Sequence, residues 1–177
     1  MLIRLLILCF VYFLPYVAAA QQKTLPALKI NQSIKIDGNL DDAAWKIAEP
    51  ISNFITISPV FGKPAKRISK VKLVYDNNAI YIGAYLYDNP STIRKQLTAR
   101  DMLDRQNVDI FTVGFDTYHD KQNAFIFRVS PANVQSDIKI SQSGAVYDHS
   151  WDAVWESKTS IKADGWVAEI KIPLSAI

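Results

Sequence analysis

Cysteine is nearly absent from this chain of 177 residues, since its one cysteine, Cys9, lies within the apolar N-terminal run. Removal of residues 1–20 as a signal peptide would leave a chain with no cysteine at all. This absence excludes disulfide bonds, a thiolate metal site and a cysteine nucleophile. The remaining domain of about 157 residues has to rely on its own apolar core, and that length is sufficient for one core.

The chain also contains few histidines and has little net charge. The two histidines, His119 and His149, lie in predicted loops, and neither accompanies a serine or cysteine in a nucleophile motif. Phosphate-binding and dinucleotide-binding glycine motifs are absent. The formal net charge is only +3 at pH 7, and no basic run indicates a nucleic-acid partner. The sequence therefore predicts no enzyme activity in this chain.

The first twenty residues are typical of a secretory signal peptide. Arg4 supplies the basic start, an apolar run extends from Leu5 to Val17, and three alanines precede Gln21. The apolar run is too short for a membrane span. The sequence therefore predicts export, with a mature chain that begins at Gln21.

The rest of the chain is dominated by short runs that alternate apolar and polar residues. After a polar lead-in at 21–33, one short helix is expected around Ala43–Ala48, and Pro50 ends it. Period-two patterns then predict strands, most of them joined as hairpins by polar turns. These runs are 71–75 and 79–88, 107–116 and 123–130, 133–140, and 150–161 and 165–174. Residues 34–177 are thus predicted to be all-β, an antiparallel β-sandwich of the jelly-roll or immunoglobulin-like kind with one short N-terminal helix.

Two tryptophans stand four residues apart in "HSWDAVWES", residues 149–157. They could form a platform on which a sugar ring stacks, or they could be core residues of one strand. Strand geometry turns Trp151 and Trp155 to the same side, away from Asp152 and Glu156. Core packing is the expectation for Trp155 and Trp166. Trp151, at the beginning of the strand, is the candidate for exposure.

A long irregular segment, residues 89–106, separates two predicted hairpins, and long loops on β-scaffolds often carry function. Acidic residues gather there and in the following hairpin, and oxygen-rich loops suit Ca²⁺. Asp104, Asp116 and Asp120 are the candidate calcium ligands, although no spacing matches a calcium-loop signature. Solvated loop acids are the alternative interpretation.

Four longer motifs occur in a recognisable order: "IDGNLDDAAW", "VKLVYDNNAIYIGAYLYD", "DRQNVDIFTVGFDTYHDKQNAFIF" and "DGWVAEIKIPLSAI". Together they resemble the family-nine carbohydrate-binding module over about residues 34–177. The stretches "TARD", "NVQSD" and "WDAVW" are similar to a subgroup found at the N-terminus of exported Bacteroidetes-type proteins. Those proteins continue into a large C-terminal region thought to be an outer-membrane β-barrel.

This resemblance implies a β-sandwich that binds the end of a mono- or disaccharide and carries structural calcium. In the family a sugar lies between two tryptophans, and acidic side chains bind its hydroxyls. Asp101 and Asp109 align with such acids, but the first clamp tryptophan is replaced by Leu103, and the second falls beyond Ile177. The candidate carbohydrate-binding residues are therefore Arg100, Asp101, Asp109 and Trp151.

Two hypotheses of different classes follow from the resemblance. In the first, the chain is a non-catalytic exported carbohydrate-binding module, an accessory to carbohydrate catabolism by a glycoside hydrolase. In the second, it is a structural or interaction domain attached to an outer-membrane β-barrel and binds no sugar. Both place the protein in the periplasm or at the cell surface. Because the family continues past the motif that ends at Ile177, we also expect this chain to be part of a longer protein.

Overall fold

The computed structural model describes residues 24–105 and 107–177. The predicted signal peptide, residues 1–20, lies outside the described residues and stays a prediction. None of the helices in the described residues has the length and apolar character that crossing a membrane requires.

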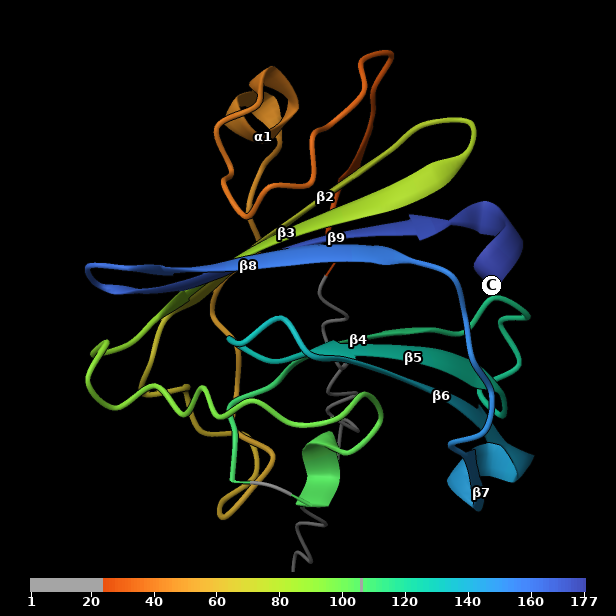
Figure 1. The fold of residues 1–177 in the computed structure, drawn as a ribbon. Coiled ribbons are helices and arrows are strands. Elements are labelled where there is room, and N and C mark those ends of the chain that lie inside the picture. The colour runs from red at the N-terminus through yellow and green to blue at the C-terminus, as the bar shows by residue number, and fades with distance from the viewer. Residues whose placement is uncertain (1–23, 106) are drawn as a thin grey trace, which may run out of the picture.

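Two β-sheets face each other (Figure 1). The first contains, in spatial order, β1 (Ala27–Lys29), β2 (Ser69–Tyr75), β3 (Ala79–Tyr87), β9 (Gly165–Pro173) and β8 (Glu156–Lys162). The second contains β4 (Phe111–Phe115), β5 (Ala124–Val129), β6 (Gln135–Ser141) and β7 (Val146–Asp148). All neighbouring strands are antiparallel except β1 and β2. The predicted all-β sandwich is confirmed.

Helical structure is limited to four short pieces in the described residues. They are α1 (Ala43–Ile47), and the single 3₁₀ turns η1 (Leu103–Arg105), η2 (Gln142–Gly144) and η3 (Leu174–Ala176). The predicted N-terminal helix is confirmed as α1. Asp42 precedes α1 at the N-cap position, but its side chain makes no capping hydrogen bond.

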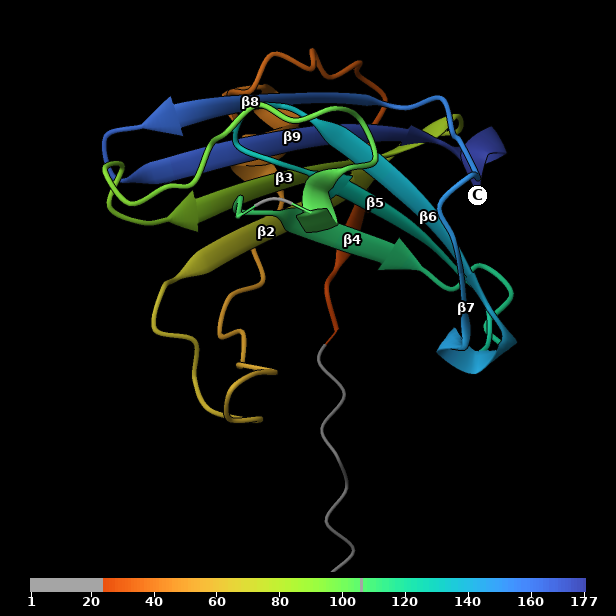
Figure 2. The ribbon, with the colours of Figure 1, turned by 60° about the horizontal axis from the view of Figure 1, so that its bottom comes forward.

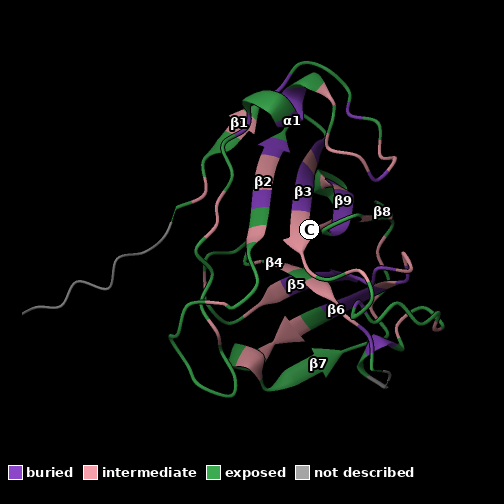
Figure 3. Cartoon of the chain, turned by 90° about the vertical axis from the view of Figure 1, so that its left-hand side faces the viewer, coloured by how far each residue is buried: buried purple, intermediate pink, exposed green. Residues whose placement is uncertain are grey.

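The main core lies between the two sheets. Ile82 of β3 lies opposite Ile170 of β9, and both side chains are buried. Phe127 of the four-stranded sheet packs into the same cluster, as do Trp155 and Trp166. Figure 3 shows buried segments along β3 and β9. The alternate apolar residues of β3 and β9 thus face this core, because every second residue of a strand points to the same side.

The outer face of the five-stranded sheet is also covered. The segment that contains α1 crosses it on the side away from the four-stranded sheet (Figure 1). Trp45 of α1 is completely buried there beside Val74 and Tyr81. Gly83 of β3 makes this close approach achievable, since a Cβ atom at that position would lie 2.7 Å from Leu40 Cδ2. A side chain at this position would force Leu40 to shift and would press on Trp45, whose Cε3 atom would lie 3.3 Å from the added Cβ.

A buried carboxylate joins this covering segment to β9. Glu169 is completely buried. Its Oε2 atom accepts hydrogen bonds from the backbone N–H groups of Asp37 and Gly38, each at 2.9 Å, and its Oε1 accepts one from Trp45 Nε1 at 2.8 Å. Burial raises the pKa of the Glu169 carboxyl, while the hydrogen bond from Trp45 acts in the opposite direction. The motifs "IDGNLDDAAW" and "DGWVAEIKIPL" are therefore in direct contact through Glu169.

Four details differ from the sequence-based predictions. β4 covers only Phe111–Phe115 of the run 107–116 that was predicted as a strand. Residues 27–30 of the predicted lead-in are part of the sandwich, because β1 pairs with β2 and Ile30 is buried. β8 begins at Glu156 and not at Ser150, since residues 150–155 cross from one sheet to the other. β7 was not predicted, because three exposed residues show no apolar alternation.

Candidate functional site

The long segment between β3 and β4 runs along one end of the sandwich and beneath the four-stranded sheet (Figure 1). Backbone hydrogen bonds hold it in two places, from Asp101 N to Gln135 O at 3.2 Å and from Asp109 N to Arg94 O at 2.9 Å. Leu103 of this segment is completely buried against Val108 and Val134. At the position where the resemblance places the first clamp tryptophan, the chain thus has a buried leucine that offers no surface to a ligand.

Arg100 connects three parts of the chain. Its Nη1 donates a hydrogen bond to Gln135 Oε1 at 2.8 Å. Its Nη2 donates to Asp137 Oδ1 at 2.6 Å, to Asp152 Oδ1 at 2.8 Å and to the carbonyl oxygen of Ala153 at 3.2 Å. The guanidinium therefore links the long segment to β6 and to the crossing segment before β8.

Asp137 completes this network from the buried side. Its side chain is 1% exposed, and it accepts hydrogen bonds from Ala153 N at 2.6 Å and Trp155 Nε1 at 3.3 Å. Its own backbone N–H donates to Asp101 Oδ1 at 3.1 Å. The stretches "TARD", "NVQSD" and "WDAVW" are far apart in the sequence, and they meet in this one cluster of Arg100, Asp101, Gln135, Asp137, Asp152 and Trp155.

Trp151 is partly buried. Its ring lies 5.0 Å from that of Phe125 and 5.8 Å from that of Phe127, measured between centroids. Trp155 is 6% exposed and meets Phe127 edge to face. The predicted difference between a buried Trp155 and a partly exposed Trp151 is confirmed, although neither residue belongs to a strand.

Asp109 lies in a second group of polar residues. Arg94 donates to its Oδ1 from Nε at 2.9 Å and from Nη2 at 2.6 Å, and the backbone N–H of Arg94 donates to its Oδ2 at 3.0 Å. A second ion pair, between Arg67 Nε and Asp88 Oδ1 at 2.7 Å, lies nearby. Both pairs line a cavity of about 330 Å³, together with Tyr87. This size is at the lower end of the range for small-molecule sites.

The cavity walls come from several rigid elements. Tyr87 ends β3, and Trp166, at the start of β9, contributes part of the apolar lining. Arg94 and Asp109 come from the long segment that closes the other side. Asp109 was predicted from the sequence, whereas Arg67, Asp88 and Arg94 were not, because their pairing depends on contacts between distant parts of the chain.

Asp104, one of the candidate calcium ligands, is paired with an arginine. Arg128 donates to Asp104 Oδ2 at 2.7 Å and also to its Oδ1. The hydrogen bond from Arg128 lowers the pKa of the Asp104 carboxyl below its ordinary value. Because Arg128 is itself buried, this ion pair has a structural role in holding η1 against β5.

The other two candidate ligands organise the turn between β4 and β5. Asp116 accepts hydrogen bonds from the backbone N–H groups of Asp120 and Lys121 at 3.1 and 2.8 Å. The backbone N–H of Gln122 donates to Asp120, and this bond is the largest cause that lowers the pKa of that carboxyl. Among residues 24–105 and 107–177, no three or more acidic, histidine or cysteine side chains come together in a group that could hold a metal ion. Calcium binding stays a prediction from the resemblance.

The two facing sheets define an all-β sandwich with a polar cavity at one end, and sequence comparison gives the family. The model of the family described as carbohydrate family 9 binding domain-like matches residues 36–177. This chain belongs to that family. No curated protein sequence matches the chain.

Two solved structures of a family 9 carbohydrate-binding module from Caldicellulosiruptor kristjanssonii have a similar fold. The glucose complex is 21% identical, with a TM-score of 0.59 over 85% of this chain and 70% of that one. The cellotriose complex is 23% identical, with a TM-score of 0.54 over 85% of this chain and 68% of that one. At these identities the comparison shows the shared fold.

Proposed function

We propose that this chain is a non-catalytic, exported carbohydrate-binding module and that it binds the end of a saccharide in the cavity beside Asp109. The observation that carries this proposal is the cavity of about 330 Å³ lined by two carboxylates, two guanidinium groups and a tyrosine. Family membership and the glucose and cellotriose bound by two structural neighbours support a saccharide as the ligand.

The ion pairs suit the recognition of hydroxyl groups. A carboxylate has about four acceptor sites, and the three hydrogen bonds from Arg94 leave Asp109 capacity for a sugar hydroxyl. The guanidinium of Arg94 can in turn donate to a hydroxyl oxygen. Charge-assisted hydrogen bonds are about twice as strong as neutral ones. Because Arg94 and Asp109 already fix each other, little side-chain entropy is lost when the ligand binds.

Arg100 and Asp101 support this site from a distance. Their hydrogen bonds to Gln135, Asp137 and Asp152 hold the middle of the long segment against the four-stranded sheet. We propose that this cluster fixes the segment from which Arg94 and Asp109 emerge. Direct contact of a saccharide with Arg100, Asp101 or Trp151 stays a prediction.

Weak affinity is expected for a site of this kind. Leu103 is completely buried, so the ring that could cover one face of the sugar is missing. Each hydrogen bond to a charged group contributes only about 1.5–3 kcal/mol after water is displaced. Two such contacts of about 2 kcal/mol each correspond to a dissociation constant of about 1 mM, or about −4 kcal/mol.

The burial of Leu103 also favours the second hypothesis, a structural or interaction domain attached to an outer-membrane β-barrel. Under that hypothesis the paired charges at the end of the sandwich would contact the following region and bind no sugar. The accessory role beside a glycoside hydrolase and the location in the periplasm or at the cell surface belong to the proposal, and both rest on the resemblance and the predicted signal peptide.

Asp109→Asn is expected to weaken saccharide binding by about tenfold, because it replaces a charged acceptor with a neutral one. Asp41→Asn, a change at an exposed acid near α1, serves as the control and should leave binding unchanged. Calorimetric titration with glucose, xylose and their disaccharides measures both. Binding that Asp109→Asn leaves unchanged would place the site elsewhere, and no binding of any of these sugars by the unmodified chain would support the second hypothesis.

A further inference from the structure

Among the residues that the structure describes, a projecting arm between α1 and β2, residues 52–68, holds the largest group of exposed apolar side chains. Figure 2 shows it as a long excursion that points away from the sheets, next to the start of β2. The described residues contain sixteen large hydrophobic side chains that are exposed, and six of them lie in this arm. They are Phe54, Ile55, Ile57, Val60, Phe61 and Ile68.

The arm is an ordered hairpin. Ile51 and Val71 form two backbone hydrogen bonds at its base, at 2.8 and 2.9 Å. Further out, the N–H of Thr56 donates to the carbonyl of Lys63 at 2.7 Å. Ile57 and Phe61 lie at the tip and are 82% and 75% exposed. The ordered arm thus keeps these apolar side chains in solvent, too far from the core of the domain to be buried in it.

The charge of the arm has a single sign. No acidic residue occurs between Glu49 and Asp76, whereas four lysines and one arginine lie in that interval. Three of the five are already engaged, since Arg67 pairs with Asp88, Lys70 lies over the ring of Tyr87 and Lys72 donates to the carbonyl oxygen of Trp45. Lys63 and Lys66 are exposed beside the apolar tip. These two lysines form a positively charged border, called the basic collar below.

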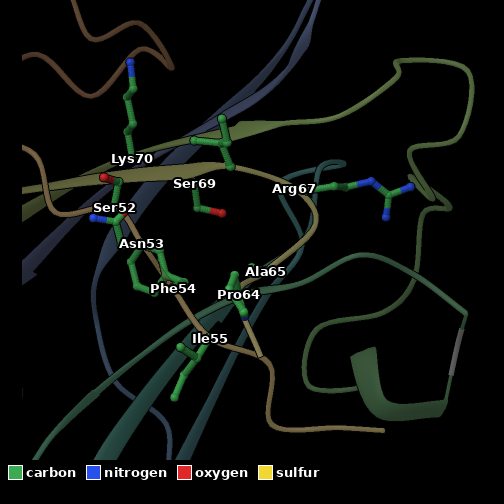
Figure 4. Close-up of a pocket in the computed structure, with 10 residues that line it drawn as sticks. Ser52, Asn53, Phe54, Ile55, Pro64, Ala65, Arg67, Ser69 and Lys70 are labelled. Carbon is green, nitrogen blue, oxygen red and sulfur yellow. The ribbon is translucent and has the colours of Figure 1, made fainter. Parts of the chain in front are cut away.

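Two shallow hollows flank the arm and are larger than the polar cavity beside Asp109. One, of about 500 Å³, lies between the arm and the beginning of β2 and is lined by Phe54, Ile55 and Pro64 among others (Figure 4). The other, of about 520 Å³, lies on the side of Val60 and Lys63. Neither hollow contains a carboxylate, so neither offers the charged acceptors that favour a saccharide.

We propose that the arm docks the protein on an anionic lipid surface. The apolar side chains of Ile57, Val60 and Phe61 would enter the boundary between headgroups and acyl chains. Lys63 and Lys66 would stay at the level of the phosphate groups, because long basic side chains place their apolar stems in the membrane and their charge at its surface. A projecting tip with a basic collar is complementary to such a surface in both polarity and charge. This proposal does not depend on saccharide binding.

A local fluorescent reporter tests the proposal. The full chain carries Cys9→Ser, so that Phe61→Cys can be labelled with a dye whose emission shifts to the blue in apolar surroundings. We expect a blue shift on vesicles that contain equal amounts of phosphatidylcholine and phosphatidylglycerol, and little shift on phosphatidylcholine alone. The same dye at Tyr118→Cys, an equally exposed position in another turn, should not shift.

Charge variants complete the test. Lys63→Gln with Lys66→Gln should weaken the vesicle affinity at position 61 by about tenfold or more, since each lysine near an anionic surface contributes to binding. Lys95→Gln with Lys121→Gln removes the same charge from other exposed positions and should have little effect. Equal shifts at positions 61 and 118, or equal shifts on neutral and anionic vesicles, would overturn the proposal. A shift that grows with protein concentration without vesicles would overturn it in favour of contact with a second copy of the chain.

Discussion

Trp155→Ala is expected to lower the free energy of unfolding by about 3–5 kcal/mol, the cost of removing a large buried aromatic side chain. Trp155 is 6% exposed, and its ring lies edge to face against Phe127 with centroids 5.4 Å apart. Its Nε1 also donates a hydrogen bond to the buried carboxylate of Asp137 at 3.3 Å. The substitution therefore leaves a cavity between the sheets and removes one partner of a buried charge.

Trp151→Ala is the matched control for this prediction. Trp151 packs against Phe125 and Phe127, but it is only partly buried, so its removal should cost clearly less. Denaturant unfolding of both variants provides the comparison. Equal losses, or a larger loss for Trp151→Ala, would contradict the assignment of Trp155 as the principal anchor of the crossing segment.

Glu169→Ala should also cost about 3–5 kcal/mol, because a buried donor left without a partner costs about 1–3 kcal/mol. Three donors, the N–H groups of Asp37 and Gly38 and the indole of Trp45, would lose their acceptor. Glu156→Ala is the control, since Glu156 forms an exposed ion pair with Lys171 and such pairs contribute about 0–1 kcal/mol. Similar losses in the two variants would show that Glu169 does not hold the covering segment.

The pKa of Glu169 predicts how its contribution changes with pH. Burial raises the pKa of this carboxyl, so the folded protein binds the proton more tightly than the unfolded chain does. The Glu169 carboxyl therefore contributes fully to stability at a pH below the ordinary glutamate pKa. This contribution declines as the pH rises through the pKa that Glu169 has in the folded protein. The unfolding free energy of the unmodified chain, relative to that of Glu169→Gln, should fall over this interval.

Most of the sandwich could be predicted from local patterns. In β3 and β9, alternate apolar residues identified the inward face, because a strand exposes successive side chains on opposite sides. The polar turn between Tyr75 and Ala79 correctly joined β2 to β3. The burial of the outer face of the five-stranded sheet was not predicted. Glu169 lies on this face, and a glutamate in a strand usually indicates a position exposed to solvent. Only the distant N–H donors of Asp37, Gly38 and Trp45 explain its burial.

The candidate site could be predicted only in part. Asp109 was identified through the resemblance, but its partner Arg94 is defined by the path of the long segment, which has no periodic pattern. The network of Arg100 and Asp137 joins residues that are 37 positions apart. Such side-chain pairing depends on the final packing of the sheets, which the residue types alone do not specify.

Chemical-shift mapping of the ¹⁵N-labelled chain during titration with glucose tests the central claim most directly. The proposed function predicts fast-exchange shifts that saturate in the range of about 1–10 mM. The largest should occur at the backbone amides of Tyr87, Asp88, Arg94 and Asp109, which line the cavity. An absence of shifts, or shifts confined to residues outside this cavity, would contradict the claim that a saccharide binds beside Asp109.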